Sequence, residues 1–187
     1  MVAQQLTAIF LDRDGTIIED AHYLSRPDQV KLVHGAAEAI ARINAAHVPV
    51  FVVTNQSGIG RGYLMPSDYE AVKDRLDELL AGRSARIDAS YHCPHAPEKG
   101  CKCRKPGIEL FQRAAADHPG VDLARAAYLG DRWRDIEPGA ALGGVSLLIP
   151  SRDTPPADIV RAEERARTAP SLAAAVTLLI GDGGAAA

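Results

Sequence analysis

Two aspartates separated by one residue are the side chains best placed to do chemistry. Asp12 and Asp14 directly follow a short apolar run, and residues two apart in an extended strand point the same way. Gly15 then allows the chain to turn sharply. A carboxylate can attack phosphorus when a cation screens the repulsion, and a second acid can protonate the leaving oxygen. The spacing therefore predicts Asp12 as a nucleophile toward a phosphate ester and Asp14 as a general acid.

Further polar residues follow other apolar runs in the chain. Thr54 and Asn55 could donate hydrogen bonds to a transferring phosphoryl group, and Lys105 could add a fixed positive charge. Asp131 would supply a second carboxylate to Mg²⁺, which prefers hard oxygen ligands and keeps several waters. Asp135 would bind the metal through a water or orient the loop. Taken together, these residues predict a magnesium-dependent phosphoryl-transfer site.

The three cysteines of the chain all lie in the segment 92–107, which is also rich in His, Pro and Gly. Three thiolates and one imidazole make an ordinary tetrahedral Zn²⁺ site, and its ligands here would be Cys93, His95, Cys101 and Cys103. With four protein ligands no position is open for water, so we expect a structural zinc that holds Arg104 and Lys105 over the phosphate. The alternatives are His92 as the fourth ligand, or free cysteines beside a surface histidine.

The elements that must position these residues alternate along the chain. Apolar runs predict strands over 8–11, 48–53, 87–92, 126–129 and 145–149, and helical spacing predicts helices over 35–46, 67–81, 108–117, 135–142 and 172–179. We expect Ser67 to cap the second helix with Glu70 in a capping box, and Pro138 to lie in the first turn of the fourth. This alternation predicts an α/β fold with a parallel sheet, helices on both faces, and ligands at the carboxyl ends of the strands.

Composition narrows the class of protein. A chain of 187 residues with 47% hydrophobic content fits one domain, which we place at 1–180, with a disordered tail over 181–187. The net charge of -3 argues against a nucleic-acid partner. No apolar run has the length of a membrane helix, and the N-terminus lacks the features of a signal peptide. We therefore expect a soluble, cytoplasmic protein without membrane contact and, since no feature suggests a dimer interface, a monomer.

The order of these motifs resembles the haloacid dehalogenase superfamily. The matching segments are Asp12-Arg13-Asp14-Gly15-Thr16, Thr54-Asn55-Gln56-Ser57, Arg104-Lys105-Pro106 and Gly130-Asp131 with Asp135. The resemblance implies a Rossmann-like fold and an aspartyl-phosphate intermediate. It also implies that Mg²⁺ is held by Asp12, the backbone carbonyl of Asp14, and Asp131. The absence of long insertions resembles the capless branch of the superfamily.

The zinc loop is similar to that of a small branch whose members hydrolyse the 7-phosphate of D-glycero-D-manno-heptose 1,7-bisphosphate or the phosphate of histidinol phosphate. Ser57 and Arg61 favour the heptose substrate, and Asp20, His22 and Tyr23 stand where such enzymes contact the sugar. The resemblance further implies a phosphorylated-sugar contact for a second group of residues: Arg13, Asn55, Gln56, Ser57, Arg61, Arg104 and Arg132. The segment Arg132-Trp133-Arg134 departs from the family pattern, and it signals either a substrate contact or a related sugar phosphate.

Other functions stay open on the sequence alone. The chain could hydrolyse a different small phosphomonoester, or it could transfer the phosphate to an acceptor other than water. It could also be a zinc-stabilised binding module with a degenerate metal site. We interpret Gly58, Gly60 and Gly62 as a flexible flap near the substrate, and the charged run 161–167 as a solvated helix face.

Overall fold

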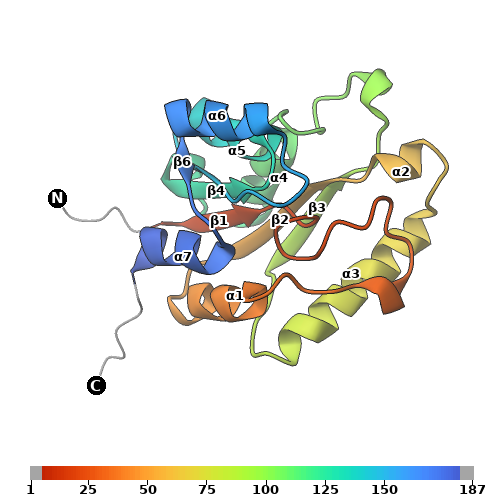
Figure 1. The fold of residues 1–187 in the computed structure, drawn as a ribbon, viewed down its shortest axis with the longest axis horizontal. Helices are drawn as coiled ribbons and strands as arrows, with labels where there is room; N and C mark the ends of the chain where they lie inside the picture. The colour runs from red at the N-terminus through yellow and green to blue at the C-terminus, as the bar shows by residue number, and fades with distance from the viewer. Residues whose placement is uncertain (1–5, 182–187) are drawn as a thin grey trace.

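A six-stranded, fully parallel sheet forms the centre of the protein (Figure 1), whose computed structural model describes residues 6–181. Its order is β3-β2-β1-β4-β5-β6, which is the Rossmann-like order. The strands are β1 Ala8–Leu11, β2 Val50–Asn55, β3 Ala89–Cys93, β4 Ala126–Gly130, β5 Val145–Leu148 and β6 Arg167–Thr168. The predicted α/β fold with a parallel sheet is therefore confirmed.

Helices cover both faces of the sheet, as predicted. They are α1 Ala36–Ala45, α2 Ser57–Gly60, α3 Pro66–Ala81, α4 Glu109–Asp117, α5 Trp133–Leu142, α6 Pro156–Arg165 and α7 Leu172–Ile180. Helices α1, α3 and α7 lie on one side of the sheet, and α4, α5 and α6 lie on the other (Figure 1). Three short 3-10 turns, Pro27–Gln29, Pro97–Lys99 and Leu123–Arg125, occupy connecting loops.

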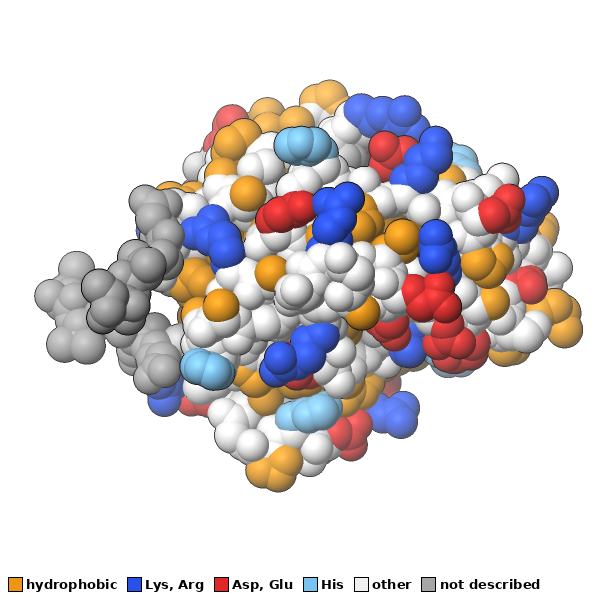
Figure 2. Space-filling model, turned by 90° about the horizontal axis from the view of Figure 1, so that it is seen from below, with side chains coloured by type: hydrophobic (Ala, Val, Ile, Leu, Met, Phe, Trp, Pro, Cys, Tyr) orange, Lys and Arg blue, Asp and Glu red, His pale blue; other side chains and the backbone are white. Residues whose placement is uncertain are grey.

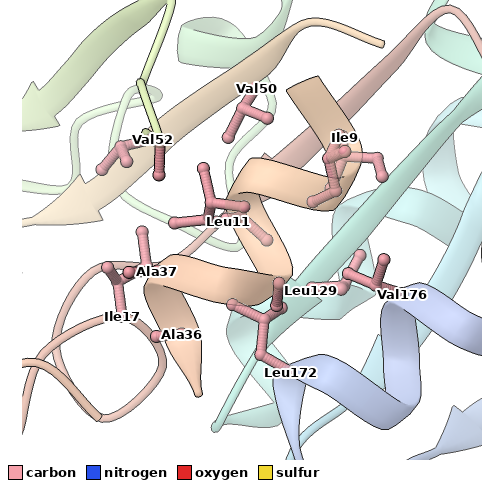
Figure 3. Packing of buried hydrophobic residues seen from close by; sticks show 14 of the residues in the cluster. Ile9, Leu11, Ile17, Ala36, Ala37, Val50, Val52, Leu129, Leu172 and Val176 are labelled. Carbon is pink, nitrogen blue, oxygen red and sulfur yellow. The ribbon is translucent and has the colours of Figure 1, made fainter. Parts of the chain in front are cut away.

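Alternate residues of β1 supply two separate cores, because successive side chains of a strand point to opposite faces. Ile9 and Leu11 join the aliphatic cluster under α1 and α7, where Val176 also packs (Figure 3). On the other face Phe10 stacks on Tyr128, with ring centroids 5.2 Å apart, and also contacts Phe51 and Phe111. Burying each of these side chains contributes roughly 2–3 kcal/mol, so β1 is fixed firmly from both sides.

Helices α1, α3, α4 and α5 begin one or two residues away from their predicted starts. Helix α3 begins at Pro66, one residue early, and the Asp68 carboxylate accepts a hydrogen bond from the Met65 N–H at 2.8 Å. The predicted cap at Ser67 with Glu70 is therefore wrong, because proline favours the first helical position. Helix α5 begins at Trp133, so Pro138 lies in its second turn rather than its first.

The loops also contain elements that differ from the predicted ones. The expected flap contains the helix α2, which starts at Ser57. The third strand runs on to Cys93, so its last residue is the first predicted zinc ligand. The helix face predicted over 161–167 is correct as far as Arg165, where α6 ends; Arg167 begins β6, which pairs with β5.

The described residues contain no separate cap domain beside the sheet (Figure 1). None of their helices has the length and apolar character required to cross a membrane. On the side that lies at the bottom of Figure 1, acidic and basic side chains are interspersed (Figure 2). The predicted disordered tail lies outside the described residues apart from Gly181, whose carbonyl accepts a hydrogen bond from Arg42 at 2.8 Å.

Candidate active site

The site forms where the carboxyl ends of β1 and β4 meet. These strands are neighbours, and the chain leaves β1 toward β2 on the opposite side, so a crevice opens between their ends. Asp12 follows β1 and Asp131 follows β4, and the Asp12 N–H donates to the Leu129 carbonyl at 2.9 Å. The topology alone therefore brings together two carboxylates that are more than a hundred residues apart in sequence.

Three buried carboxylates lie close together at this point, and an ammonium group binds two of them. Oxygens of Asp12, Asp131 and Asp135 all lie within 4.8 Å of one another, and these residues are 8%, 2% and 3% exposed. Lys105 Nζ lies 2.7 Å from Asp12 Oδ1 and 2.9 Å from Asp135 Oδ1, and it also donates to the Val53 carbonyl at 2.6 Å. Lys105 is thus fixed in three directions.

Burial, together with the neighbouring charges, changes the pKa of these groups. Burial raises the pKa of Asp12 to about 7; Lys105 opposes this shift, and the neighbouring carboxylates add to it. Burial likewise raises the pKa of Asp131 to about 6, against a hydrogen bond from Ser151. Burial lowers the pKa of Lys105, but the two carboxylates outweigh it and raise the pKa overall, so the amine stays charged.

The donor set fits Mg²⁺, because carboxylate oxygens this close together favour a hard cation between them. Asp12 and Asp131 are the predicted carboxylate ligands, and Asp135 lies near enough to join them directly or through water. The Asp14 carboxylate does not belong to this group. A contribution from its backbone carbonyl stays a prediction.

Asp14 is instead held beside the group by three side chains. Arg13 donates two hydrogen bonds to its carboxylate, each 3.0 Å long, and Gln56 Nε2 donates a third at 2.9 Å. Thr54 Oγ1 reaches the same carboxylate at 3.5 Å. Arg13 is buried, and its guanidinium lies 5.5 Å from the centre of the Tyr69 ring. Arg13 and Gln56, predicted as substrate contacts, therefore orient the candidate acid.

Asn55 clamps the backbone of Lys105. Its Oδ1 accepts a hydrogen bond from the Lys105 N–H at 2.9 Å, and its Nδ2 donates to the Lys105 carbonyl at 3.2 Å. The structure therefore places the Asn55 amide on the chain that carries the cation, where we had predicted a contact to the phosphoryl group.

The loop after β5 holds Asp131, and the sequence prediction did not include it. Ser151 Oγ donates to Asp131 Oδ2 at 2.8 Å, and Thr154 Oγ1 donates to the Asp131 carbonyl at 2.7 Å. Arg132 Nε lies 3.3 Å from the same Oδ2. The sequence signal for Ser151 and Thr154 was weak, because hydroxyl residues after a strand most often form only a local turn.

Gly15 allows the first motif to pack against Asp131. Its φ is +81°, and a Cβ built on it would lie 2.5 Å from Asp131 Oδ2. Both facts require glycine at this position, since an L side chain would be strained and would displace the carboxylate.

A cavity of about 220 Å³ opens beside Asp14. Asp20, His22 and Tyr23 line it, and their contact with a sugar stays a prediction. His22 and Tyr23 both have a positive φ, which points to a constrained turn. Its other lining residues are Arg13, Asp14, Leu24, Asn55, Gln56, Ser57, Gly58 and Arg134. Arg61, Arg104 and Arg132 are not among them.

Two of those arginines lie against other parts of the site. Arg61 pairs with Glu98 of the zinc loop at 2.9 Å, which joins the end of α2 to that loop. Arg104 lies next to Lys105 on the same loop, and its Nη1 is buried without a hydrogen-bond partner among the described residues. An anion bound there would supply the missing acceptor.

The four predicted zinc ligands converge. Cys93 Sγ lies 3.5 Å from Cys101 Sγ and 3.3 Å from Cys103 Sγ, and His95 Nδ1 lies 3.2 Å from Cys103 Sγ. A tetrahedral ion with Zn–S bonds of about 2.3 Å holds its ligands at roughly 3.5–3.8 Å from one another. The cluster of soft ligands therefore fits one Zn²⁺ ion. His92 is not a member of it; its ring packs against that of Tyr69, tilted by 36°, with the ring centroids 4.0 Å apart.

Comparison with known proteins shows the family of the chain. Residues 102–175 match a family model described as HAD-hydrolase-like. The D-glycero-beta-D-manno-heptose-1,7-bisphosphate 7-phosphatase of Escherichia coli O6:H1 is 35% identical over 156 residues, which is 79% of this chain and 82% of that protein. The enzyme of the same name from Pseudomonas aeruginosa is 38% identical over 142 residues, covering 75% of this chain and 79% of its own. The chain belongs to this family of haloacid dehalogenase-like phosphatases.

A solved structure agrees over almost the whole chain. The D,D-heptose 1,7-bisphosphate phosphatase of B. bronchiseptica, crystallised with magnesium and phosphate, superimposes with a TM-score of 0.85 at 32% identity. The match covers 94% of this chain and 98% of that one. Membership of this family confirms the predicted phosphoric monoester hydrolase and the predicted superfamily.

Proposed function

We propose that this protein is a Mg²⁺-dependent phosphatase that hydrolyses the 7-phosphate of D-glycero-D-manno-heptose 1,7-bisphosphate through an aspartyl-phosphate intermediate. The observation that carries the proposal is the group of buried carboxylates Asp12, Asp131 and Asp135 beside Lys105. The group lies at the carboxyl ends of the strands of a fold that the chain shares with a solved phosphatase. The relatives' names support the heptose substrate.

In the first step an Asp12 carboxylate oxygen attacks phosphorus, and the bond from phosphorus to the sugar oxygen breaks. Asp14 gives its proton to that leaving oxygen, which departs as the sugar hydroxyl. The hydrogen bonds from Arg13 and Gln56 fix the Asp14 carboxylate beside Asp12 for this transfer. The product of this step is a phosphoryl group on Asp12.

In the second step a water attacks the phosphoryl group, and the Asp14 carboxylate accepts its proton. The bond between phosphorus and Asp12 breaks, which releases inorganic phosphate and restores Asp12. Lys105 Nζ, 2.7 Å from Asp12 Oδ1, lies where it can stabilise charge on the phosphoryl oxygens in both steps. Thr54 Oγ1 lies 3.5 Å from the Asp14 carboxylate, and from there it would donate a hydrogen bond to the phosphoryl group.

Magnesium would be held by Asp12, Asp131 and the Asp14 carbonyl, with Asp135 direct or through water. When bound, it supplies the neutralisation that lets an anionic nucleophile approach an anionic phosphate. The four residues Cys93, His95, Cys101 and Cys103 would hold a structural zinc. This zinc would stabilise the loop that carries Arg104 and Lys105.

The test is phosphate release, with Mg²⁺, from heptose 1,7-bisphosphate, histidinol phosphate and hexose phosphates. We expect the heptose bisphosphate to give the highest kcat/KM. Asp12→Asn should lower kcat at least about 1,000-fold, because it removes the nucleophile. Asp28→Asn, an equal charge change at an exposed residue paired with Arg26, should leave the rate unchanged.

Full activity of Asp12→Asn would sink the nucleophile assignment. A preference for histidinol phosphate would contradict the substrate and leave the mechanism intact. Absence of Mg²⁺-dependent turnover on every substrate would favour a non-catalytic binding module.

A further inference from the structure

The segment Arg132-Trp133-Arg134, directly after Asp131, separates into three different environments. Arg132 turns back to the metal site: its Nε lies 3.3 Å from Asp131 Oδ2, and its side chain is only 20% exposed. Its N–H donates to Asp135 Oδ2 at 3.0 Å. Arg132 is therefore occupied in holding the carboxylate group.

Trp133 packs away from the site. It belongs to a small apolar cluster with Ile136, and the Arg161 guanidinium lies 4.4 Å above its ring. The backbone N–H of Trp133 donates to Asp158 Oδ2 at 2.8 Å. These contacts join α5 to α6 and leave the indole no part in the cavity beside Asp14.

Arg134 alone of the three lines that cavity, and its side chain is 50% exposed. Its nearest anion is Asp135 Oδ1, which lies 3.9 Å from its Nε, at the long limit of an ion pair. That same oxygen already binds Lys105 at 2.9 Å. The guanidinium of Arg134 is consequently open to an anionic ligand.

The other described residues that line the cavity offer no second free guanidinium or ammonium group. Among the described residues that line it, the only other Lys or Arg is Arg13, which is committed to Asp14 by two hydrogen bonds. The carboxylate of Asp20 and the hydroxyl group of Ser57, which also line the cavity, suit hydroxyl groups of a ligand. The volume of about 220 Å³ would hold roughly seven water molecules. A polyhydroxylated group that carries an anion fits this lining.

We propose that Arg134 binds the second, non-reacting phosphate of a bisphosphorylated sugar and so sets the preference for a bisphosphate over a monophosphate. The inference rests on the proposed function, in which one phosphate reacts at Asp12 while the sugar occupies the cavity. Guanidinium matches phosphate with paired hydrogen bonds, and its charge is fixed at all working pH values. Arg134 is thus a specificity determinant, whereas Asp12 and Lys105 contact the phosphoryl group that reacts.

The test compares two substrates that differ only in that phosphate: heptose 1,7-bisphosphate and heptose 7-phosphate. In Arg134→Gln we expect the KM for the bisphosphate to rise about tenfold or more, with kcat within twofold, because one charge-assisted contact is lost. The kinetics on the 7-phosphate should not change. Arg134→Lys should recover part of the loss. Arg75→Gln, an equal charge change at a residue of α3 that does not line the cavity, should behave as wild type.

A direct measurement separates binding from turnover. Calorimetry of the two sugars with the Mg²⁺-loaded Asp12→Asn protein should show that Arg134→Gln removes the affinity gap between them. The proposal would be overturned if Arg134→Gln left kcat/KM unchanged for both substrates. It would also be overturned if kcat/KM fell equally for both, since Arg134 would then act on the reacting phosphate. Either result leaves the proposed function standing, because wild type still turns over; a wild type inactive on both sugars would overturn the two together.

Discussion

At the scale of single residues, the partners of a side chain decide its role more than its type does. Asn55 carries an amide that suits a phosphate, yet both of its polar atoms bind the Lys105 backbone. Gln56 and Arg13 likewise bind Asp14. These residues form the support of the reacting groups, and their effect on the reaction passes through Lys105 and Asp14.

Asn55→Ala should therefore lower activity by misplacing Lys105. Asn44 is a matched control because it makes the same pair of hydrogen bonds to the Arg86 backbone, at 2.8 and 3.2 Å, far from the site. Both substitutions leave backbone groups unsatisfied and should cost about 1–3 kcal/mol of unfolding free energy. Only Asn55→Ala should also lower kcat, by about tenfold or more, with KM little changed.

Chemical denaturation and steady-state kinetics on both variants check this prediction. Equal kcat values for the two proteins would show that Asn55 contributes stability and nothing further.

Gly15→Ala tests the close approach of the first motif to Asp131. The new methyl group would meet Asp131 Oδ2, so we expect the half-saturating Mg²⁺ concentration to rise about tenfold. Gly35→Ala provides the control, because Gly35 has a similar φ of +77° but nothing within 4 Å of its Cβ position. The conformational strain, about 1–2 kcal/mol, is then shared by both variants.

The measurement is activity against Mg²⁺ concentration, with thermal unfolding alongside. If Gly35→Ala raises the half-saturating Mg²⁺ concentration as much as Gly15→Ala does, backbone strain is the cause and the contact with Asp131 is not.

At the scale of elements, the zinc loop and α2 form one unit. The Gly60 N–H donates to the Pro94 carbonyl at 2.7 Å, and Arg61 pairs with Glu98. The loop between Cys93 and Lys105 has only one short 3-10 turn and few buried apolar side chains. Its order therefore depends on the four converging ligands and on these few contacts.

Removal of zinc should unfold this unit first. A zinc-selective chelator, added with Mg²⁺ kept in excess, should lower the Tm by several degrees and abolish most activity, because Lys105 loses its fixed position. Cys103→Ser should reproduce both effects, and metal analysis should find one zinc per chain in the untreated protein. Unchanged melting and activity after zinc removal would refute the structural role.

At the scale of the whole molecule, the sequence predicts the sheet and the meeting of Asp12, Thr54, Lys105 and Asp131 well. Apolar runs that stop at polar residues mark strand ends, and a parallel sheet places all such ends at one edge. The prediction from sequence fails where the conformation of a loop or the boundary of a helix determines which side chains meet. Ser151 and Thr154 reach Asp131 only through the fold of their loop, and α6 has a single fully buried residue, Ala162, and so little apolar signal. Arg134 could not be separated from Arg132 until their surroundings were known.

The central position of β1 has a consequence for how the molecule moves. Its backbone is bonded to a strand on each side, and its side chains fill both cores. We expect amides there to exchange with solvent only when the whole domain opens, and the turn at His22 and Tyr23, which lies outside the strands of the described residues, to open at lower cost. The proposed nucleophile therefore follows a strand that is held on both sides, and the proposed sugar-facing wall lies on a turn with fewer contacts. Changes in that wall can alter which sugar is accepted while the groups that carry out the reaction stay in place.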